Sequence, residues 1–212
     1  MPTLMLGIGT CTSTPTRGAT TTGATMTGAS RSTTGTGEIR STWPPIQRSG
    51  ASTVMFGHIE EPWELAQHMT VIRELQERTG GITEFVPLSF IPFMTLLGRT
   101  HGVEEISREE NLKHTAVFRL ALGKTITNVQ ASWVKMGIET ATEALRWGVN
   151  DLGGTLMEES ISRLAGSYHG VRLDPPQLVA AAHAAGRPAA ERSTLYDILR
   201  EHPLGAPREA VA

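Results

Sequence analysis

Cysteine is nearly absent from this sequence of 212 residues, in which Cys11 is the single example. One thiol cannot form a disulfide within the chain, and it cannot supply the several thiolates that a zinc or iron–sulfur site requires. Runs of about eighteen or more apolar residues are also missing, so no transmembrane helix is predicted. The N-terminal MPTLMLGIGT lacks the basic region and the long apolar region of a signal peptide. We therefore expect a cytoplasmic protein.

An excess of basic residues is missing as well. Lys and Arg number 19 against 21 Asp and Glu, which gives a formal net charge of -2. Nonspecific binding to nucleic acid requires a surplus of positive charge, so we expect no nucleic-acid partner. The content of 39% hydrophobic residues is sufficient for a buried core.

Residues 1–50 contain little that could form such a core. This segment has 14 Thr, 5 Ser and 8 Gly, no Lys, and Glu38 as its single acidic residue. It keeps neither a helical nor an alternating apolar period for long, and such a segment cannot bury enough apolar surface to offset the entropy of ordering. We interpret residues 1–50 as low-complexity, either disordered or read out of frame. They precede a folded region at 51–205 and a tail at 206–212.

From Ala51 onward, short apolar runs alternate with amphipathic stretches. Strands are predicted over residues 52–56, 83–90, 126–137 and 149–154. Helices are predicted after them over residues 60–81, 107–123, 139–148 and 158–166. Ser107 and Glu110 have the spacing of a capping box at the start of the second helix. Strand-then-helix units in succession favour an α/β fold with a parallel sheet.

Each unit is roughly 25 to 35 residues long, the repeat expected of a (β/α) barrel, whose full eight units need about 250 residues. The predicted fold class is therefore a partial (β/α) barrel. In that architecture, functional groups lie at the C-terminal ends of the strands and in the loops that follow them.

The predicted strand at 126–137 contains an unusual number of polar residues. Side chains alternate along a strand, so one face would carry Asn128, Gln130 and Ser132, and the other Val129, Ala131, Trp133 and Lys135. Polar groups near the strand exit can face a cavity at the mouth of a barrel. They can equally be polar residues that are satisfied at a strand end, and the pattern alone leaves both interpretations open.

Several segments, in this order, resemble the C-terminal half of the CofH-type radical SAM enzymes: STVMFGHIEEP, GGITEFVPLSFIP, ITNVQASWVKMG, NDLGGTLMEESISRLAG and GRPAAERSTLYDIL. CofH is the second subunit, or second half, of FO synthase, which builds the deazaflavin chromophore of coenzyme F(420). The resemblance implies that the units here are the last four βα units of a radical SAM TIM-like barrel. Two menaquinone-pathway enzymes, aminofutalosine synthase and the dehypoxanthine futalosine cyclase, have similar MFGH and DLGGT-like segments and remain an alternative.

The resemblance implies a transferase that uses S-adenosylmethionine and a 4Fe-4S cluster as cofactors. The adenosyl radical attacks L-tyrosine, and a 4-hydroxybenzyl group is joined to 5-amino-6-(D-ribitylamino)uracil. These two small molecules are the expected substrates. The protein's task would be to hold cofactor and substrates within reach and to exclude water.

The resemblance also implies roles for particular residues. Contacts to S-adenosylmethionine fall on Gly57, Glu60, Phe85 and Pro87. Contacts to the substrates fall on Asn128, Gln130, Trp133, Lys135, Asp151 and Glu158. Amides can pair with a pyrimidine edge, a lysine can balance an anion, and an indole can stack on a ring. No metal-binding residues are expected, because His58, Glu60 and His101 lack a tight ligand spacing.

The sequence departs from the family at the cluster. Radical SAM enzymes bind it through three cysteines of a CxxxCxxC loop, whereas Cys11 has no companion, so the cluster ligands are absent. We expect the chain to be an inactive fragment by itself. It could come from a disrupted gene, or it could form half of a barrel with a partner chain that carries the cluster. A cluster-free binding module is a further alternative.

Overall fold

The computed structural model describes residues 4–7, 50–155, 160–169 and 172–205. All of them belong to one compact unit, formed by Met1–Gly9 and Gln47–Ala212. A second unit, Thr10–Ile46, lies outside the described residues.

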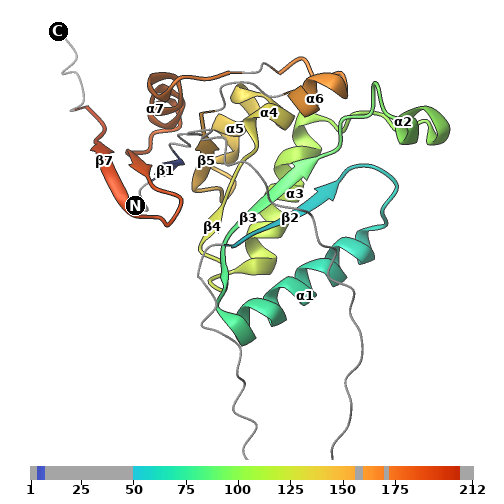
Figure 1. The fold of residues 1–212 in the computed structure, drawn as a ribbon, viewed down its shortest axis with the longest axis horizontal. Coiled ribbons are helices and arrows are strands. Elements are labelled where there is room, and N and C mark those ends of the chain that lie inside the picture. Colours follow the sequence, from blue (N-terminus) through green and yellow to red (C-terminus); the bar gives the residue numbers. More distant parts are fainter. Residues whose placement is uncertain (1–3, 8–49, 156–159, 170–171, 206–212) are drawn as a thin grey trace, which may run out of the picture. The chain divides into compact units, whose positions relative to one another are not determined.

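Strands and helices alternate along most of the described chain (Figure 1). The strands are β1 (Leu4–Gly7), β2 (Gly50–Phe56), β3 (Ile82–Ser89), β4 (Asn128–Val129), β5 (Asp151–Gly154), β6 (Ala189–Arg192) and β7 (Ile198–His202). The helices are α1 (Pro62–Thr79), α2 (Leu96–His101), α3 (Arg108–Leu122), α4 (Trp133–Met136), α5 (Ile138–Ala144), α6 (Ser160–Leu164) and α7 (Pro175–Ala184). Each of the strands β2 to β5 is followed by a helix, which confirms the predicted α/β succession.

The strands form two hydrogen-bonded groups, β2-β3-β4 and β5-β1-β6-β7. An isolated parallel bridge between Gln130 and Asp151 connects β4 to β5. The pairs β2-β3, β3-β4, β1-β5 and β1-β6 are parallel, and β6-β7 is antiparallel. The fold is thus a mixed α/β arrangement with mainly parallel strands.

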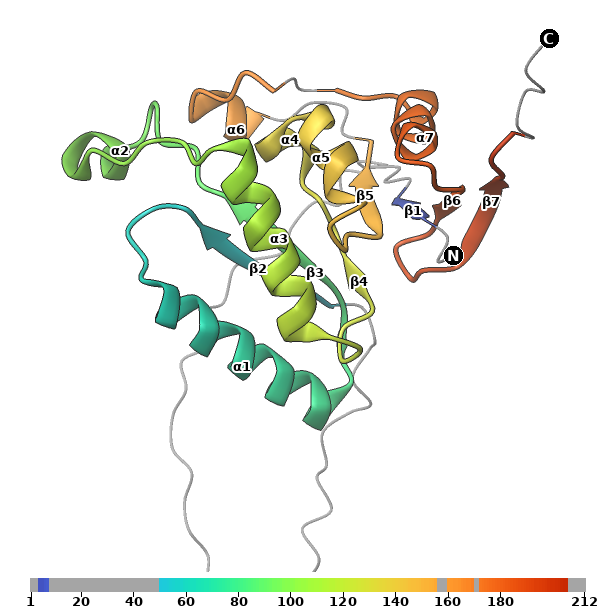
Figure 2. The same ribbon diagram turned by 180° about the vertical axis from the view of Figure 1, so that it is seen from behind.

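Helices α1, α3, α5 and α7 contact one another in this order, and they follow the strand order β2, β3, β4 and β5 (Figure 2). Phenylalanine rings form the contact between α3 and the sheet. Phe56 of β2 and Phe85 of β3 are completely buried, and their ring centroids lie 5.3 and 5.7 Å from that of Phe118 in α3. Burial of apolar surface stabilises this layer by roughly 25 cal/mol per Å².

Local signals explain where the two long helices begin and end. Pro62 opens α1 and Gly80 ends it with a left-handed φ of 62°, which glycine adopts without steric cost. At the start of α3, the Ser107 hydroxyl accepts a hydrogen bond from the N–H of Glu110 at 3.2 Å. The Glu110 carboxylate accepts one from the N–H of Ser107 at 3.1 Å. The predicted capping box is therefore confirmed.

The predicted strand at 126–137 is wrong beyond its first residues. Only Asn128–Val129 forms β4, and Trp133–Met136 forms α4, so Trp133 and Lys135 do not lie on a strand face. The carbonyl of Ser132 accepts hydrogen bonds from the N–H groups of Lys135 and Met136 at 3.0 and 3.1 Å. These local bonds close a helical turn, and their formation outweighs the β-like alternation of the sequence.

Other elements were not predicted. The short helix α2 lies between the predicted strand at 83–90 and the predicted helix at 107–123, and α7 with the β6-β7 pair follows the last predicted unit. Leu4–Gly7 is a strand, although it falls in the segment interpreted as low-complexity; residues 8–49 of that segment lie outside the described residues. Within the described part of the chain, no helix has the length and apolar character needed to cross a membrane.

Candidate functional site

Strand alternation gives the sheet two chemically different faces. Phe56 and Phe85 face the helices, so Glu84 points to the opposite side of β3. The register pairs Glu84 with Asn128, and the bridge pairs Gln130 with Asp151. We call the surface that carries Glu84, Gln130 and Asp151, away from the helix layer, the inner face.

A compact polar cluster occupies the inner face. Arg192 of β6 donates from Nε to Oδ2 of Asp151 at 2.6 Å and from Nη2 to Oε2 of Glu84 at 3.1 Å. The hydroxyl of Tyr196, in the turn after β6, lies 2.6 Å from Oε2 of Glu84 and 3.2 Å from Oδ2 of Asp151. The Arg192 guanidinium carbon lies 3.9 Å from the centroid of the Tyr196 ring. We call these four residues the inner-face cluster.

Burial changes the proton affinities in the inner-face cluster. Asp151 is completely buried, and this burial raises its pKa from 3.8 to about 6, although Arg192 and the N–H of Gly153 counteract the rise. Burial, followed by the charge of Asp151, also raises the pKa of the Tyr196 hydroxyl above its usual value. Tyr196 therefore keeps its proton, and its hydroxyl can donate a hydrogen bond to a carboxylate.

Two polar groups of the inner face, one within the cluster and one next to it, have unused hydrogen-bonding capacity. The contacts of Glu84 within the described residues all use Oε2, and its side chain is 20% exposed, so Oε1 has no partner in this part of the chain. The side-chain amide of Gln130 has no hydrogen-bond partner in the same part of the chain. Gly153, with φ of 71°, lies directly against this amide, where a β-carbon would collide with it.

The other predicted substrate residues are placed differently. Asn128 donates to the carbonyl of Thr83 at 2.9 Å and accepts from Asn150 at 3.1 Å, so both ends of its amide are used within the protein. Trp133 is 3% exposed and its indole N–H contacts the carbonyl of Gly154 at 3.3 Å. Lys135 lies in α4. Of the predicted set, the structure brings together Gln130 and Asp151, and Glu158 lies outside the described residues.

Two of the predicted cofactor residues lie at the C-terminal end of β2. Gly57 has φ of 80°, and its N–H donates to Oε1 of Glu60 at 2.5 Å, while the N–H of His58 donates to Oε2 at 2.8 Å. Partial burial raises the pKa of Glu60, but these backbone donors outweigh it and hold the pKa below its usual value. The Glu60 carboxylate thus closes the turn that follows the strand.

Phe85 and Pro87 lie on the helix-facing side of β3. Phe85 is completely buried against Phe118, and strand alternation places Pro87 on the same side. A ligand on the inner face cannot reach the Phe85 ring. Their role in binding S-adenosylmethionine stays a prediction, and this burial favours a packing role.

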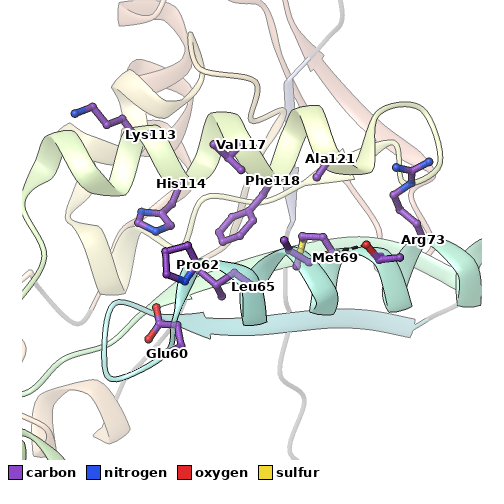
Figure 3. Close-up of a pocket in the computed structure, with 12 residues that line it drawn as sticks. Glu60, Pro62, Leu65, Met69, Arg73, Lys113, His114, Val117, Phe118 and Ala121 are labelled. Carbon is purple, nitrogen blue, oxygen red and sulfur yellow. Dashed lines mark hydrogen bonds between the residues drawn. The ribbon is translucent and has the colours of Figure 1, made fainter.

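An apolar groove of about 500 Å³ lies between α1 and α3 (Figure 3). Leu65 and Met69 of α1 and Val117 and Phe118 of α3 form much of its walls, and Glu60 lies at one end. The groove borders the helices, whereas the inner face lies on the other side of the sheet. The groove is large enough for a ligand and mainly apolar, but its lining contains no group of paired polar side chains comparable with the inner-face cluster. The inner face is therefore the candidate site.

A 4Fe-4S cluster does not fit the donor set of this chain. Such a cluster is held by cysteine thiolates, and Cys11 is the single cysteine in the sequence. No chemical step is therefore assigned to a cluster bound by this chain.

Sequence reasoning missed Glu84, Arg192 and Tyr196. The available signal was chemical: Glu84 is a charged residue inside the apolar strand ITEFVPLS, and Arg192 ends the strand AAER. A charge at such a position is costly unless it is paired. The identity of the partners could not be found from the sequence, because Glu84 and Arg192 are 108 residues apart.

Comparison with known proteins identifies the family. The CofH/MqnC C-terminal region matches residues 79–204 of the chain. The 5-amino-6-(D-ribitylamino)uracil--L-tyrosine 4-hydroxyphenyl transferase 1 of Methanosarcina barkeri is 47% identical over 158 residues, which cover 71% of this chain and 41% of that protein. The FO synthase of Mycobacterium tuberculosis is 42% identical over 163 residues, covering 76% of this chain and 19% of that protein.

The FO synthase of Streptomyces coelicolor is 45% identical over 176 residues, covering 82% of this chain and 20% of that protein. The chain therefore spans about two fifths of the length of the transferase and about one fifth of the length of the FO synthases. The inner-face cluster falls inside the segment matched to the family. From this match over more than half of its length, the chain belongs to the CofH/MqnC C-terminal family.

Proposed function

We propose that this chain forms the substrate-binding, C-terminal part of a radical SAM transferase of the FO synthase type, in the biosynthesis of coenzyme F(420). Several relatives are named as 5-amino-6-(D-ribitylamino)uracil--L-tyrosine 4-hydroxyphenyl transferases, and others are named FO synthase. The observation that carries the proposal is the inner-face cluster together with the open amide of Gln130. These groups supply the hydrogen-bond acceptors and donors that an aminouracil requires.

The proposed architecture is half of a (β/α) barrel. The succession of β2 to β5 with helices on one side supports it, as does the parallel pairing. Among the described strands, β2 lies at one edge of its sheet, and in a complete barrel this edge would pair with a further strand. A partner chain, or a further part of the same protein, would supply those strands and the three cysteines of the cluster.

In this proposal, S-adenosylmethionine and the 4Fe-4S cluster supply the radical once the barrel is complete. Gly57 and Glu60 lie at the strand end where a cofactor would approach, and the Glu60 carboxylate holds the turn between them. Trp133 and Lys135 of α4, together with Glu158, which lies outside the described residues, remain proposed substrate contacts. The chain by itself is then inactive, because it holds substrate without the means to generate a radical.

The family description also includes MqnC, so a futalosine-type radical SAM enzyme of menaquinone biosynthesis is the second candidate. The names of the relatives favour the transferase, since they specify an aminouracil and tyrosine. The test is to combine the purified chain with the cluster-bearing N-terminal part of the Methanosarcina barkeri relative and to supply both substrates. Formation of the coupled product, detected by mass, supports the proposal. A parallel reaction supplies dehypoxanthine futalosine in place of these two substrates, and its turnover without any coupled product in the first reaction supports the second candidate.

A further inference from the structure

We propose that Glu84 and Gln130 form a recognition pair for the pyrimidine ring of the aminouracil, and that Tyr196 and Arg192 act as positioning residues for Glu84. This inference rests on the proposed function and decides which of its two substrates the inner face receives. It assigns binding to Glu84, which neither the sequence motifs nor the family description indicates.

The first argument is the balance of donors and acceptors. Oε1 of Glu84 is an anionic acceptor without a partner in the described residues, and the Gln130 amide offers one acceptor and two donors. An aminouracil presents ring N–H and amino groups next to carbonyl oxygens. Its N–H groups match the Glu84 carboxylate, and its carbonyl and N–H edge matches the amide of Gln130. A charged acceptor strengthens such hydrogen bonds roughly twofold relative to neutral ones.

The second argument is charge. The inner-face cluster contains the carboxylates of Glu84 and Asp151 and the guanidinium of Arg192, so negative groups outnumber positive ones. Arg192 is 5% exposed, and its Nε, Nη1 and Nη2 donate to Asp151, to the carbonyl of Ser193 and to Glu84. The carboxylate of L-tyrosine would meet like charge here without a free cation in the cluster. The neutral aminouracil, which is rich in N–H groups, is therefore the substrate that the inner face binds.

The third argument concerns how Glu84 is held. Tyr196 has φ of 69°, a left-handed conformation that non-glycine residues rarely adopt and that the surrounding structure must stabilise. The turn supplies this support, because the N–H of Tyr196 donates to the carbonyl of Ser193 at 3.1 Å and that of Ser193 to Asp197 at 2.9 Å. This conformation places the Tyr196 hydroxyl in contact with the carboxylates of both Glu84 and Asp151. Tyr196 and Arg192 both bind Oε2 of Glu84, which leaves Oε1 without a partner among the described residues.

The experiment measures binding of 5-amino-6-(D-ribitylamino)uracil, and separately of L-tyrosine, to the full chain by calorimetry. Glu84→Gln keeps the size of the side chain and removes the anionic acceptor. We expect the Kd for the aminouracil to rise about tenfold or more, the loss typical of one hydrogen bond to a charged group. Gln130→Ala should raise it about three- to tenfold, the loss typical of a neutral hydrogen bond.

The chain offers a matched control in Glu105. Its side chain is also 20% exposed, and its Oε2 accepts a hydrogen bond from the hydroxyl of Tyr168 at 2.9 Å. Glu105→Gln should therefore leave the Kd unchanged. Circular dichroism and thermal unfolding of each variant separate loss of binding from loss of fold.

A positioning role for Tyr196 requires its own readout. Tyr196→Phe removes the hydroxyl and should weaken aminouracil binding through Glu84. In the double variant with Glu84→Gln, the second substitution should then add nothing, which a double-mutant cycle measures. Additive losses would overturn this role for Tyr196.

Unchanged aminouracil binding in folded Glu84→Gln would overturn the recognition pair, and so would a loss confined to L-tyrosine. Failure of the folded wild-type chain to bind the aminouracil would also overturn it. The proposed function has a different readout, since it depends on product formation with the cluster-bearing part. Product formation without a Glu84 effect would refute this inference alone.

Discussion

Replacement of Asp151 by Asn tests the electrostatics of the inner face. Asp151 is completely buried, and its carboxylate accepts from the N–H of Gly153 at 2.6 Å as well as from Arg192. Burial disfavours the ionised form more than these donors favour it, so the pKa rises from 3.8 to about 6. Asp151→Asn keeps the shape of the side chain and removes its titration.

The magnitude follows from proton linkage. Between pH 3.8 and about 6, the folded protein binds more protons at Asp151 than the unfolded chain does. Stability contributed by this group is therefore present at low pH and is lost as the pH rises through the folded pKa. The full difference between the two pKa values corresponds to about 3 kcal/mol, most of which falls between pH 4 and 7.

The assay is urea unfolding of the wild-type chain and Asp151→Asn at several pH values from 4 to 7. The free energy of unfolding of the wild type, minus that of the variant, should fall by about 2 kcal/mol or more over this range. Asp174→Asn is the control, because Asp174 is 54% exposed and Asn remains a good N-cap for α7. A difference that stays flat or grows with pH would mean that Arg192 stabilises the Asp151 carboxylate more than burial destabilises it.

Two further predictions concern the core and the cluster chemistry. Phe118→Ala removes a ring that is 1% exposed and contacts Phe56 and Phe85, so it should lower the free energy of unfolding by about 3 to 5 kcal/mol in urea. Leu120→Ala, at a side chain 80% exposed in the same helix, should change it by about 0.5 kcal/mol or less, and equal losses would contradict the packing described. Anaerobic reconstitution with iron and sulfide should give no 4Fe-4S absorbance, because Cys11 is the single thiol. A stable cluster on this chain would refute that reasoning.

The elements that could be predicted from the sequence are those with local causes. The apolar runs at 52–56 and 83–90 form strands, and Ser107 with Glu110 starts a helix as its spacing predicts. The strand prediction was wrong after Val129, because the alternation of polar and apolar residues in that stretch also fits a short helical turn. Backbone hydrogen bonds from Ser132 decide between the two, and the pattern does not contain them.

The candidate site was predicted only in part, for a related reason. Gln130 and Asp151 were selected through the family resemblance, and the structure places them side by side. Glu84, Arg192 and Tyr196 come together from segments far apart in the chain, and their selection requires the sheet register. Asn128 has the residue type suited to a pyrimidine, but its amide is used by Thr83 and Asn150. Residue type alone therefore could not separate a binding amide from a structural one.

The central claim is that this chain supplies the aminouracil-binding part of an FO synthase-type transferase. The most direct measurement is product formation by mass spectrometry in parallel anaerobic reactions with both substrates and S-adenosylmethionine. One reaction contains the chain alone, another the cluster-bearing N-terminal part of a relative alone, and a third contains both. We predict the coupled product only in the combined reaction. Product from the chain alone, or its absence from the combined reaction while the same relative's own C-terminal part restores it, would contradict the account.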